Sequence, residues 1–273
     1  RRSPELCRAG SAGHGGASGR LMRRGILLKS PTALERLAKI DTVAFDKTGT
    51  LTVGQLGLAD SPDPEALRFA AGMAASSRHA LSQALRAACP AAPALPGIVE
   101  HPGEGLSLRM AGGEAPLGSR RFCGIADGAD DCRPELWLAR PDQAPVRFTF
   151  ADRMRPDAMQ VIAALGHSRK QIMLLSGDRA ASVADTARQA GIARFHAEMS
   201  PAGKCALLAE EAAAGRKVLM VGDGLNDAPA LAAAYVSLSP ASGADVSQTA
   251  ADAVFQGTSL GAVTELLRVA ASS

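Results

Sequence analysis

Short apolar runs that each end in a polar turn recur along this chain, and they constrain its fold more than any other feature. The runs Thr42–Asp46, Ile172–Leu175 and Val218–Val221 are rich in Val, Ile, Leu, Met and Phe, and Arg147–Phe150 has a similar character. Strands that are apolar throughout are typical of sheets buried on both faces. These runs therefore predict a parallel sheet covered by helices on each side.

Stretches with helical spacing lie between the later of these predicted strands. The apolar residues of 158–165 fall at i, i+3, i+4 and i+7. Similar patterns follow over 183–187 and about 203–214, and each is closed by a glycine. Strands that alternate with helices in this way predict an α/β fold with a Rossmann-like parallel sheet.

One long segment breaks this alternation. It contains two helical patterns, Pro64–Ala75 and His79–Ala88, followed by a proline-rich hinge and glycine-containing short strands. We therefore predict a small α+β domain inserted into the main one. The predicted boundaries are 1–29 for a flexible lead, 30–52 plus 147–262 for the main domain, 53–146 for the inserted domain and 263–273 for a tail.

Composition excludes several classes of function. The 30 Lys and Arg residues nearly balance the 27 Asp and Glu residues, and seven Phe, one Trp and one Tyr are the only aromatic residues. Neither charge nor aromatic content therefore indicates nucleic acid as a partner. No run reaches the roughly 18 to 20 apolar residues that cross a bilayer, so the chain as given is expected to be soluble. Five widely spaced cysteines without a C-x-x-C pair indicate neither a disulfide framework nor a cysteine metal site.

Polar side chains gather where the predicted strands end. They are Asp46, Lys47, Thr48, Ser176, Asp178, Asp223, Asn226 and Asp227. Because ligands bind at the carboxyl ends of parallel strands, we expect these side chains to form one site. Carboxylate and hydroxyl oxygens suit Mg²⁺, which would screen a phosphoryl group from the acids. Lys204 would balance the charge, and Asp46 is the best nucleophile, because a carboxylate can accept a phosphoryl group.

Four motifs resemble those of P-type cation-transporting ATPases, whose catalytic core belongs to the haloacid dehalogenase-like superfamily. In the family's order they are Asp46-Lys-Thr-Gly-Thr-Leu-Thr52, Ser176-Gly-Asp178, Pro201-Ala-Gly-Lys204 and Val221-Gly-Asp-Gly-Leu-Asn-Asp-Ala-Pro-Ala-Leu231. The resemblance covers about Ala17 to Leu267. It implies ATP and Mg²⁺ as ligands, a phosphorylation domain at 30–52 plus 147–262, and a nucleotide-binding domain at 53–146.

The resemblance also implies a role for individual residues. Asp46 would attack the γ-phosphate of ATP, Lys204 would stabilise the charge on the transferred group, and Ser176 would donate to a phosphate oxygen. Mg²⁺ would be held by Asp46, Thr48, Asp223 and Asp227, and Thr48 would also contact phosphate. Gly177, Asp178 and Asn226 would contribute to binding of the nucleotide and its phosphates. Asp152 and Arg155 resemble a D-x-x-R segment at the hinge between the two domains.

Thr48 separates two reaction types within the superfamily. Phosphatases usually have a second Asp two residues after the nucleophile, which acts as general acid and later activates water. Here Thr48 takes that position, so an aspartyl phosphate on Asp46 is expected to persist. A soluble haloacid dehalogenase-like phosphatase is the alternative function, and Thr48 and the inserted domain oppose it.

The inserted domain resembles the nucleotide-binding domain of heavy-metal-transporting members. That domain is marked by a His-Pro dipeptide and a later G-x-G, and His79, Gly103 and Gly105 stand in the matching places. His79 would pack on adenine, and the glycines would let the backbone approach the nucleotide. Ala80 replaces the proline and Ala74 replaces an acidic residue, so the sequence leaves the adenine affinity open.

The segment Val236–Gln256, together with Ser176 in place of Thr, looks most like bacterial copper ATPases associated with cytochrome oxidase assembly. Copper is thus the expected cation, although the ion-selecting residues of the family lie in membrane helices outside this chain. The resemblance implies a membrane partner through flanking helices and a position on the cytoplasmic side of the bacterial inner membrane. We expect a catalytic fragment with membrane-proximal ends, an unrelated segment over 1–16, and no actuator domain.

Overall fold

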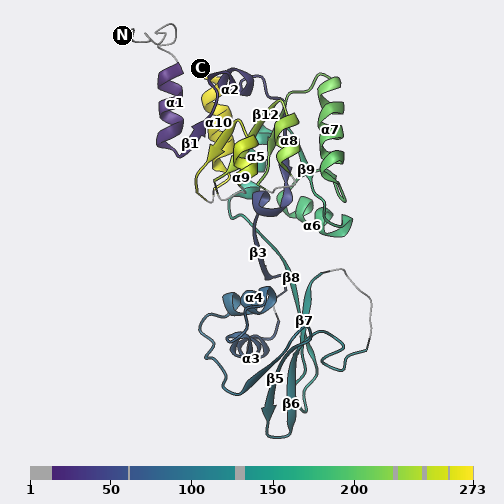
Figure 1. Cartoon of the computed structure of the whole chain (residues 1–273). Coiled ribbons are helices and arrows are strands. Elements are labelled where there is room, and N and C mark those ends of the chain that lie inside the picture. The colour runs from purple at the N-terminus through teal and green to yellow at the C-terminus, as the bar shows by residue number, and fades with distance from the viewer. Residues whose placement is uncertain are drawn as a thin grey trace, which may run out of the picture. The chain divides into compact units, whose positions relative to one another are not determined.

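The computed structural model describes residues 14–60, 62–126, 133–223, 227–241, 245–257 and 259–272. The chain forms two compact units (Figure 1). Unit 1 comprises Arg1–Val53 and Met154–Ser273, and unit 2 comprises Gly54–Arg153. The second crossing between the units lies at 153/154 instead of the expected 146/147, because β8 is one continuous strand over Val146–Met154. No helix of the described residues has the length and apolar character needed to cross a membrane.

Unit 1 is built on a seven-stranded sheet with the order β1-β13-β12-β11-β2-β9-β10. Its strands are β1 (Ile26–Leu28), β2 (Thr42–Asp46), β9 (Gln171–Leu175), β10 (Arg194–His196), β11 (Val218–Val221), β12 (Val236–Pro240) and β13 (Ala253–Phe255). All neighbours pair in parallel except β1, which pairs antiparallel with β13. This arrangement confirms the predicted α/β fold with a Rossmann-like parallel sheet.

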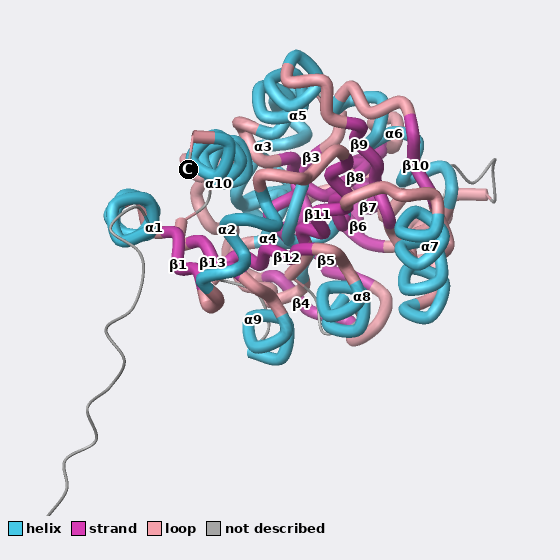
Figure 2. Tube along the Cα trace, turned by 90° about the horizontal axis from the view of Figure 1, so that it is seen from above, coloured by secondary structure: helices cyan, strands magenta, loops and turns pink. Residues whose placement is uncertain are grey.

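Helices cover both faces of this sheet. They are α1 (His14–Arg23), α2 (Pro31–Leu37), α5 (Ala158–His167), α6 (Ala180–Ala190), α7 (Pro201–Ala213), α8 (Ala228–Ala233), α9 (Asp245–Ala250) and α10 (Gly261–Ala271). Val43 and Phe45 of β2 join the core beneath α5 and α10, whereas Ala44 joins the core beneath α7 and α8. Figure 2 shows these two pairs of helices on opposite sides of the sheet. Successive strand residues are buried on opposite faces, as their apolar character predicted.

The described parts of the predicted lead (1–29) and of the predicted tail (263–273) pack into unit 1. Within the described residues, Ala17 and Leu21 of α1 are buried in the main core of unit 1, and Ile26 of β1 pairs with Phe255. Leu266 of α10 is buried in the same core. The i, i+4 pair in α1 buries one helical face despite the glycine-rich composition, so α1, β1 and α10 are part of the core of unit 1.

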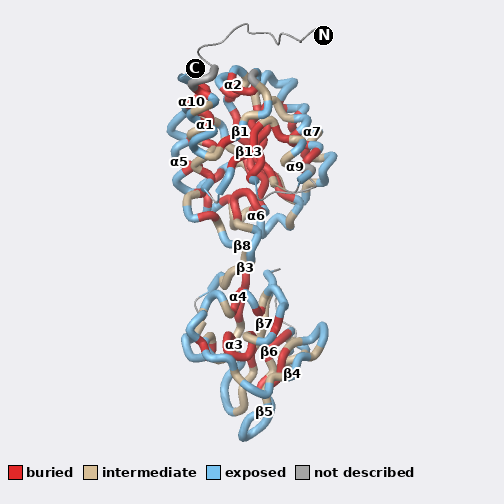
Figure 3. Tube along the Cα trace, turned by 60° about the vertical axis from the view of Figure 1, so that its left-hand side comes forward, coloured by how far each residue is buried: buried red, intermediate tan, exposed pale blue. Residues whose placement is uncertain are grey.

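Unit 2 has a six-stranded sheet with the order β3-β8-β7-β6-β5-β4 and antiparallel pairing from β8 to β4. The strands besides β8 are β3 (Thr52–Leu58), β4 (Ile98–His101), β5 (Gly105–Met110), β6 (Gly113–Gly118) and β7 (Glu135–Leu138). The helices α3 (Pro64–Ala74) and α4 (Ala80–Ala88) share a core with this sheet that includes Phe148 and Leu106. Figure 3 shows separate buried cores in the two units, and the predicted α+β insertion is confirmed.

Candidate functional site

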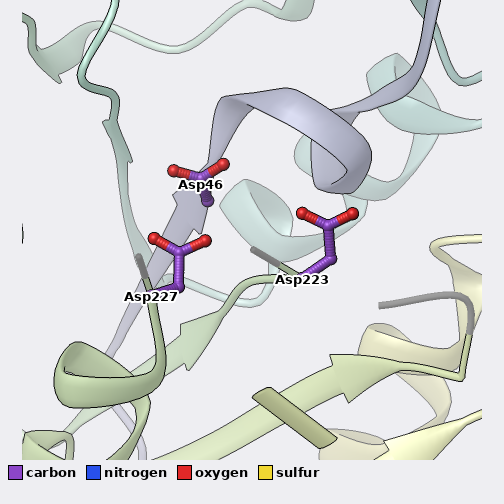
Figure 4. Close-up of side chains that lie close together, drawn as sticks. All are labelled: Asp46, Asp223 and Asp227. Atoms are coloured by element: carbon purple, nitrogen blue, oxygen red, sulfur yellow. The ribbon is translucent and has the colours of Figure 1, made fainter. Parts of the chain in front are cut away.

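Three carboxylates converge at the carboxyl end of the unit 1 sheet. Asp46 is the last residue of β2, Asp223 follows the neighbouring strand β11, and Asp227 directly precedes α8. One oxygen from each lies within 4.8 Å of the others. Figure 4 shows the three side chains arriving from separate segments with their carboxylates gathered together. The parallel pairing of β2 with β11 explains why residues so far apart in the sequence meet here.

Lys204 is the buried cation of this cluster. It lies in the first turn of α7, which begins with Pro201 and is capped by Ser200 accepting a hydrogen bond from the backbone N–H of Gly203. The Lys204 ammonium donates to Asp46 Oδ1 at 2.5 Å and to Asp227 Oδ1 at 2.6 Å. Only 6% of its side chain is exposed, so these two carboxylates supply the charge partners that a buried ammonium needs.

Burial and the repulsion between carboxylates raise the pKa values of two acids in this cluster. Burial and the neighbouring Asp227 raise the pKa of Asp46 to about 7, although Lys204 opposes the shift. Burial and Asp227 likewise raise the pKa of Asp223 to about 6. Burial alone would lower the pKa of Lys204, but Asp46 and Asp227 outweigh it and raise that pKa. One ammonium therefore does not compensate three acids, and the cluster favours a further cation.

The turn after Asp46 brings its backbone against Asp223. Residues Lys47–Leu51 form a distorted π-helical turn in which Gly49 has a φ of 72°. A Cβ atom on Gly49 would stand 1.6 Å from Asp223 Oδ2, so a larger residue would force the turn or this carboxylate to move. Glycine suits this position for two reasons: the backbone is left-handed, and the Asp223 carboxylate lies close to the Cα atom.

Arg155 holds the same turn from the other side. Its side chain is buried and donates to the carbonyl oxygens of Thr50 and Gly49, both at 2.7 Å. The backbone N–H of Arg155 also donates to the carbonyl of Leu51 at 2.9 Å. Sequence reasoning assigned Arg155 to an interdomain hinge, whereas the structure also makes it a brace for the turn that follows Asp46.

Lys47 ties this turn to the loop after β9. Its buried ammonium forms an ion pair with Asp178 and donates to Ser182 Oγ at 3.1 Å. Asp178 therefore has a protein partner at the position where sequence analysis expected a contact with bound ligand. Ser176 is buried at the end of β9, and its hydroxyl accepts a hydrogen bond from the backbone N–H of Asp178 at 3.1 Å. The loop is thus ordered by contacts within unit 1.

The other predicted site residues fall into three groups. Thr48 and Gly177 are exposed beside the cluster, in the turn after β2 and in the loop after β9. Asn226 lies outside the described residues. His79, Gly103 and Gly105 belong to unit 2. The structure therefore brings Asp46, Asp223, Asp227 and Lys204 into direct proximity. The structure also shows contacts of Lys47 that the sequence analysis did not assign. The position of Lys47 next to Asp46 in the sequence could have suggested a role for it.

In unit 2, His79 caps α4. Its Nδ1 accepts a hydrogen bond from the backbone N–H of Leu81 at 3.3 Å, and the side chain is exposed. Gly103 has a φ of 79° in the turn between β4 and β5. A Cβ on Gly105 would stand 2.4 Å from the carbonyl oxygen of Leu117, so close strand packing requires this second glycine.

The residues of the acidic cluster fit a divalent cation. Three carboxylates and one ammonium leave two negative charges when all four groups are ionised. Hard oxygen ligands of this kind suit Mg²⁺. Burial, together with repulsion from Asp227, raises the pKa values of Asp46 and Asp223, and a bound cation would oppose both effects. Asp46, Asp223 and Asp227 are the residues that would hold such an ion.

Comparison with known proteins agrees with this geometry. Residues 40–234 match a family model described as haloacid dehalogenase-like hydrolase. The chain is 43% identical over 250 residues to the nitrogen fixation protein FixI of Rhizobium meliloti, a match that covers 90% of this chain and 33% of that protein. It is 37% identical over 251 residues to the probable copper-transporting ATPase SynA of Synechococcus elongatus, covering 86% and 32% of the two chains.

Solved structures of metal-transporting ATPases and their catalytic domains also resemble this chain. A zinc-transporting PIB-type ATPase has a TM-score of 0.81 and 28% identity, with 95% of this chain and 45% of that chain covered. The catalytic domain of the CPx-ATPase CopB-B, solved in a study of nucleotide binding, has a TM-score of 0.64 and 26% identity, with 93% and 98% covered. The chain spans about a third of the length of the curated relatives it matches.

Proposed function

The chain belongs to the haloacid dehalogenase-like hydrolases, and its relatives are heavy-metal P-type ATPases. From this premise we propose that it is the ATP-binding, autophosphorylating catalytic part of such an ATPase. Unit 1 acts as the phosphorylation domain and unit 2 as the nucleotide-binding domain. The proposal assigns Asp46 as the residue that becomes phosphorylated.

One observation carries this proposal: a buried carboxylate at a strand end is held by a lysine beside two further carboxylates. Lys204 binds Asp46 Oδ1, and among the described residues Asp46 Oδ2 accepts no hydrogen bond. Oδ2 is thus the oxygen available for attack on phosphorus. The arrangement suits phosphoryl transfer, in which catalysis depends mainly on positioning and on charge stabilisation.

The reaction follows from these contacts. Asp46 Oδ2 attacks the γ-phosphorus of ATP, the bond from this phosphorus to the β–γ bridging oxygen breaks, and ADP leaves. The Lys204 ammonium, 2.5 Å from Asp46 Oδ1, compensates charge on the transferred group. Bound Mg²⁺, held by Asp46, Asp223 and Asp227, would neutralise phosphate charge. Thr48, Ser176, Gly177 and Asn226 are proposed to contact the phosphates or the metal.

Thr48 favours persistence of the phosphorylated form. A carboxylic acid two residues after the nucleophile would activate water, and a threonine hydroxyl is far too weak an acid or base for that role at neutral pH. A long-lived aspartyl phosphate suits a transport cycle better than a phosphatase. We propose a heavy-metal cation as cargo, copper by analogy with SynA, and a place on the cytoplasmic side of the bacterial inner membrane.

The test is transfer of label from γ-phosphate-labelled ATP to the chain in the presence of Mg²⁺. We expect an acid-stable label that hydroxylamine removes, as an acyl phosphate requires, and its loss in the Asp46→Asn variant. Asp185→Asn, which changes a partly exposed carboxylate on α6, is the matched control and should keep the label. Rapid hydrolysis of a generic phosphate ester without label on Asp46 would instead support the phosphatase alternative.

A further inference from the structure

The amino ends of the unit 1 strands carry positive charge that the phosphorylation chemistry does not use. Residues 214–217, 36–41 and 167–170 precede the neighbouring strands β11, β2 and β9. Because these three strands are parallel, their amino ends meet at one edge of the sheet. Within the three segments the only acid is Asp41, whereas six residues are cationic: Arg36, Lys39, Arg169, Lys170, Arg216 and Lys217. We term these six residues the basic edge.

Carboxylates of the protein balance only part of this charge. Arg36 forms an ion pair with Asp252, and Arg216 forms one with Glu211. Together with Asp41, these ion pairs offset three of the six positive charges. Among the described residues no carboxylate pairs with the side chains of Lys39, Arg169 and Lys217. The basic edge therefore keeps an excess of positive charge.

Arg169 occupies a backbone position that favours glycine. It follows the end of α5 with a φ of 56°, and the corresponding residues after α6 and α7 are Gly191 and Gly215, with φ values of 76° and 82°. At all three helix ends the N–H of the following residue donates to the carbonyl oxygen five residues earlier. The chain thus keeps an exposed, unpaired arginine where glycine would fit with less strain. A strained position of this kind indicates a role other than folding.

We propose that the basic edge docks on the anionic surface of a lipid bilayer, through attraction between its unpaired cations and phospholipid headgroups. This inference rests on the proposed function, which puts the chain beside the bacterial inner membrane, and it assigns the surface of unit 1 that meets the lipid. The opposite end of the sheet carries the Asp46 cluster, which has excess negative charge. An anionic surface therefore attracts one end of unit 1 and repels the other. Docking in this orientation leaves the Asp46 site facing away from the lipid.

The experiment measures co-sedimentation of the full chain with large unilamellar vesicles. One set contains phosphatidylglycerol mixed with phosphatidylcholine, and the other contains phosphatidylcholine alone. We expect binding to the anionic vesicles only, and release at high salt, because salt screens attraction between exposed charges. In the triple variant Lys39→Gln/Arg169→Gln/Lys217→Gln the partition coefficient should fall about 100-fold, since each cation near an anionic surface contributes about fivefold.

The matched control changes three exposed arginines of unit 2, in the variant Arg68→Gln/Arg109→Gln/Arg121→Gln. Both triple variants lower the formal net charge of the chain from +3 to zero. A difference between them therefore reports the position of the charges and not their total. The control should keep most of the binding to anionic vesicles.

Arg169→Gly separates docking from folding. It removes one unpaired cation and places glycine where φ is positive, so we expect a higher melting temperature together with about fivefold weaker binding to anionic vesicles. Weaker binding by a more stable chain cannot result from misfolding. Unchanged vesicle binding with an altered melting temperature would overturn the inference, because the charge would then serve only the helix end.

Two further results would overturn the inference: equal losses in the two triple variants, or equal binding of the unmodified chain to the two sets of vesicles. Labelling of Asp46 by ATP tests the proposed function separately. It should proceed at the unmodified rate in the basic-edge variants, because their substitutions lie at the other end of the sheet from Asp46. Vesicle binding can therefore fail while labelling succeeds, and labelling can fail while vesicle binding succeeds.

Discussion

The two units place their proposed functional groups in different environments. In unit 1, Asp46, Asp227 and Lys204 are at most 7% exposed and bind one another directly. In unit 2, the His79 side chain is exposed, and its Nδ1 accepts a hydrogen bond from the backbone N–H of Leu81. Chemistry that depends on charge benefits from burial, because a low dielectric strengthens each interaction. The proposed nucleotide site of unit 2 needs only an open, oriented surface, because a bound nucleotide must be able to exchange.

The pKa values of carboxylates also differ between the two units. Burial beside Asp227 raises the pKa of Asp46 to about 7. In unit 2, burial alone would raise the pKa of Glu135, but hydrogen bonds from Arg120 and Arg147 outweigh it and hold that pKa at about 2. Unit 1 thus stores unbalanced negative charge at its site, whereas the Glu135 cluster of unit 2 is balanced by its arginines. Of these two clusters, the one around Asp46 has the excess negative charge that a divalent cation would balance.

Gly49→Ala should have the largest effect. Its new Cβ would overlap Asp223 Oδ2, so the turn or the carboxylate must move, and a misplacement of about 1 Å can cost about 100-fold in rate. We expect the rate of Asp46 labelling to fall at least about 100-fold. Gly215→Ala is the matched control, because Gly215 also has a positive φ, 82°, but open space where its Cβ would stand. Equal rates in the two variants would refute the steric argument.

Arg155→Ala should have the next largest effect. It removes the side-chain hydrogen bonds to the carbonyls of Gly49 and Thr50 and the positive charge near Asp223. We expect labelling of Asp46 to slow about tenfold at saturating ATP, with unchanged ATP affinity, since unit 2 is untouched. Arg155→Lys should recover part of the rate. A change in ATP affinity without a change in labelling rate would contradict a bracing role.

Mg²⁺ should stabilise unit 1 specifically. At about 100 times its dissociation constant a ligand adds about 2.7 kcal/mol to the free energy of unfolding, which corresponds to a rise of about 5 °C or more in the melting temperature. Calorimetry of the nucleotide-free chain measures this rise. It should disappear in Asp223→Asn, because the cluster loses a proposed ligand and one of its excess charges. An Mg²⁺ response that survives in this variant would place the ion elsewhere.

The sequence predicted those elements that depend on the residue pattern of one short segment. The apolar runs ending at Asp46 and Val221 specified parallel strands, and parallel strands place their carboxyl ends together whatever the intervening chain. Contacts between side chain and backbone were not predictable in this way. Arg155 donates to the carbonyl of Gly49, which lies 106 residues earlier in the chain. This contact depends on the pairing of β3 with β8, which no local sequence pattern predicts. The sequence did not predict the burial of Leu21, because the segment is rich in glycine and only Ala17 and Leu21 form its apolar helical face.

The smallest expected effect is on acid stability in unit 2. Because the folded pKa of Glu135 is lower than its ordinary value of 4.5, its ion pairs stabilise unit 2 fully above about pH 4.5. This contribution declines as the pH falls below about 4.5 and is lost once the pH passes about 2, since the protonated acid no longer attracts Arg120 and Arg147. Glu135→Gln should therefore lower the melting temperature of unit 2 near neutral pH and should have little effect at about pH 2. Glu114→Gln, an exposed acid on the neighbouring strand β6, should leave the curve unchanged. A Glu135→Gln effect that is independent of pH would mean that packing, and not charge, accounts for the role of Glu135.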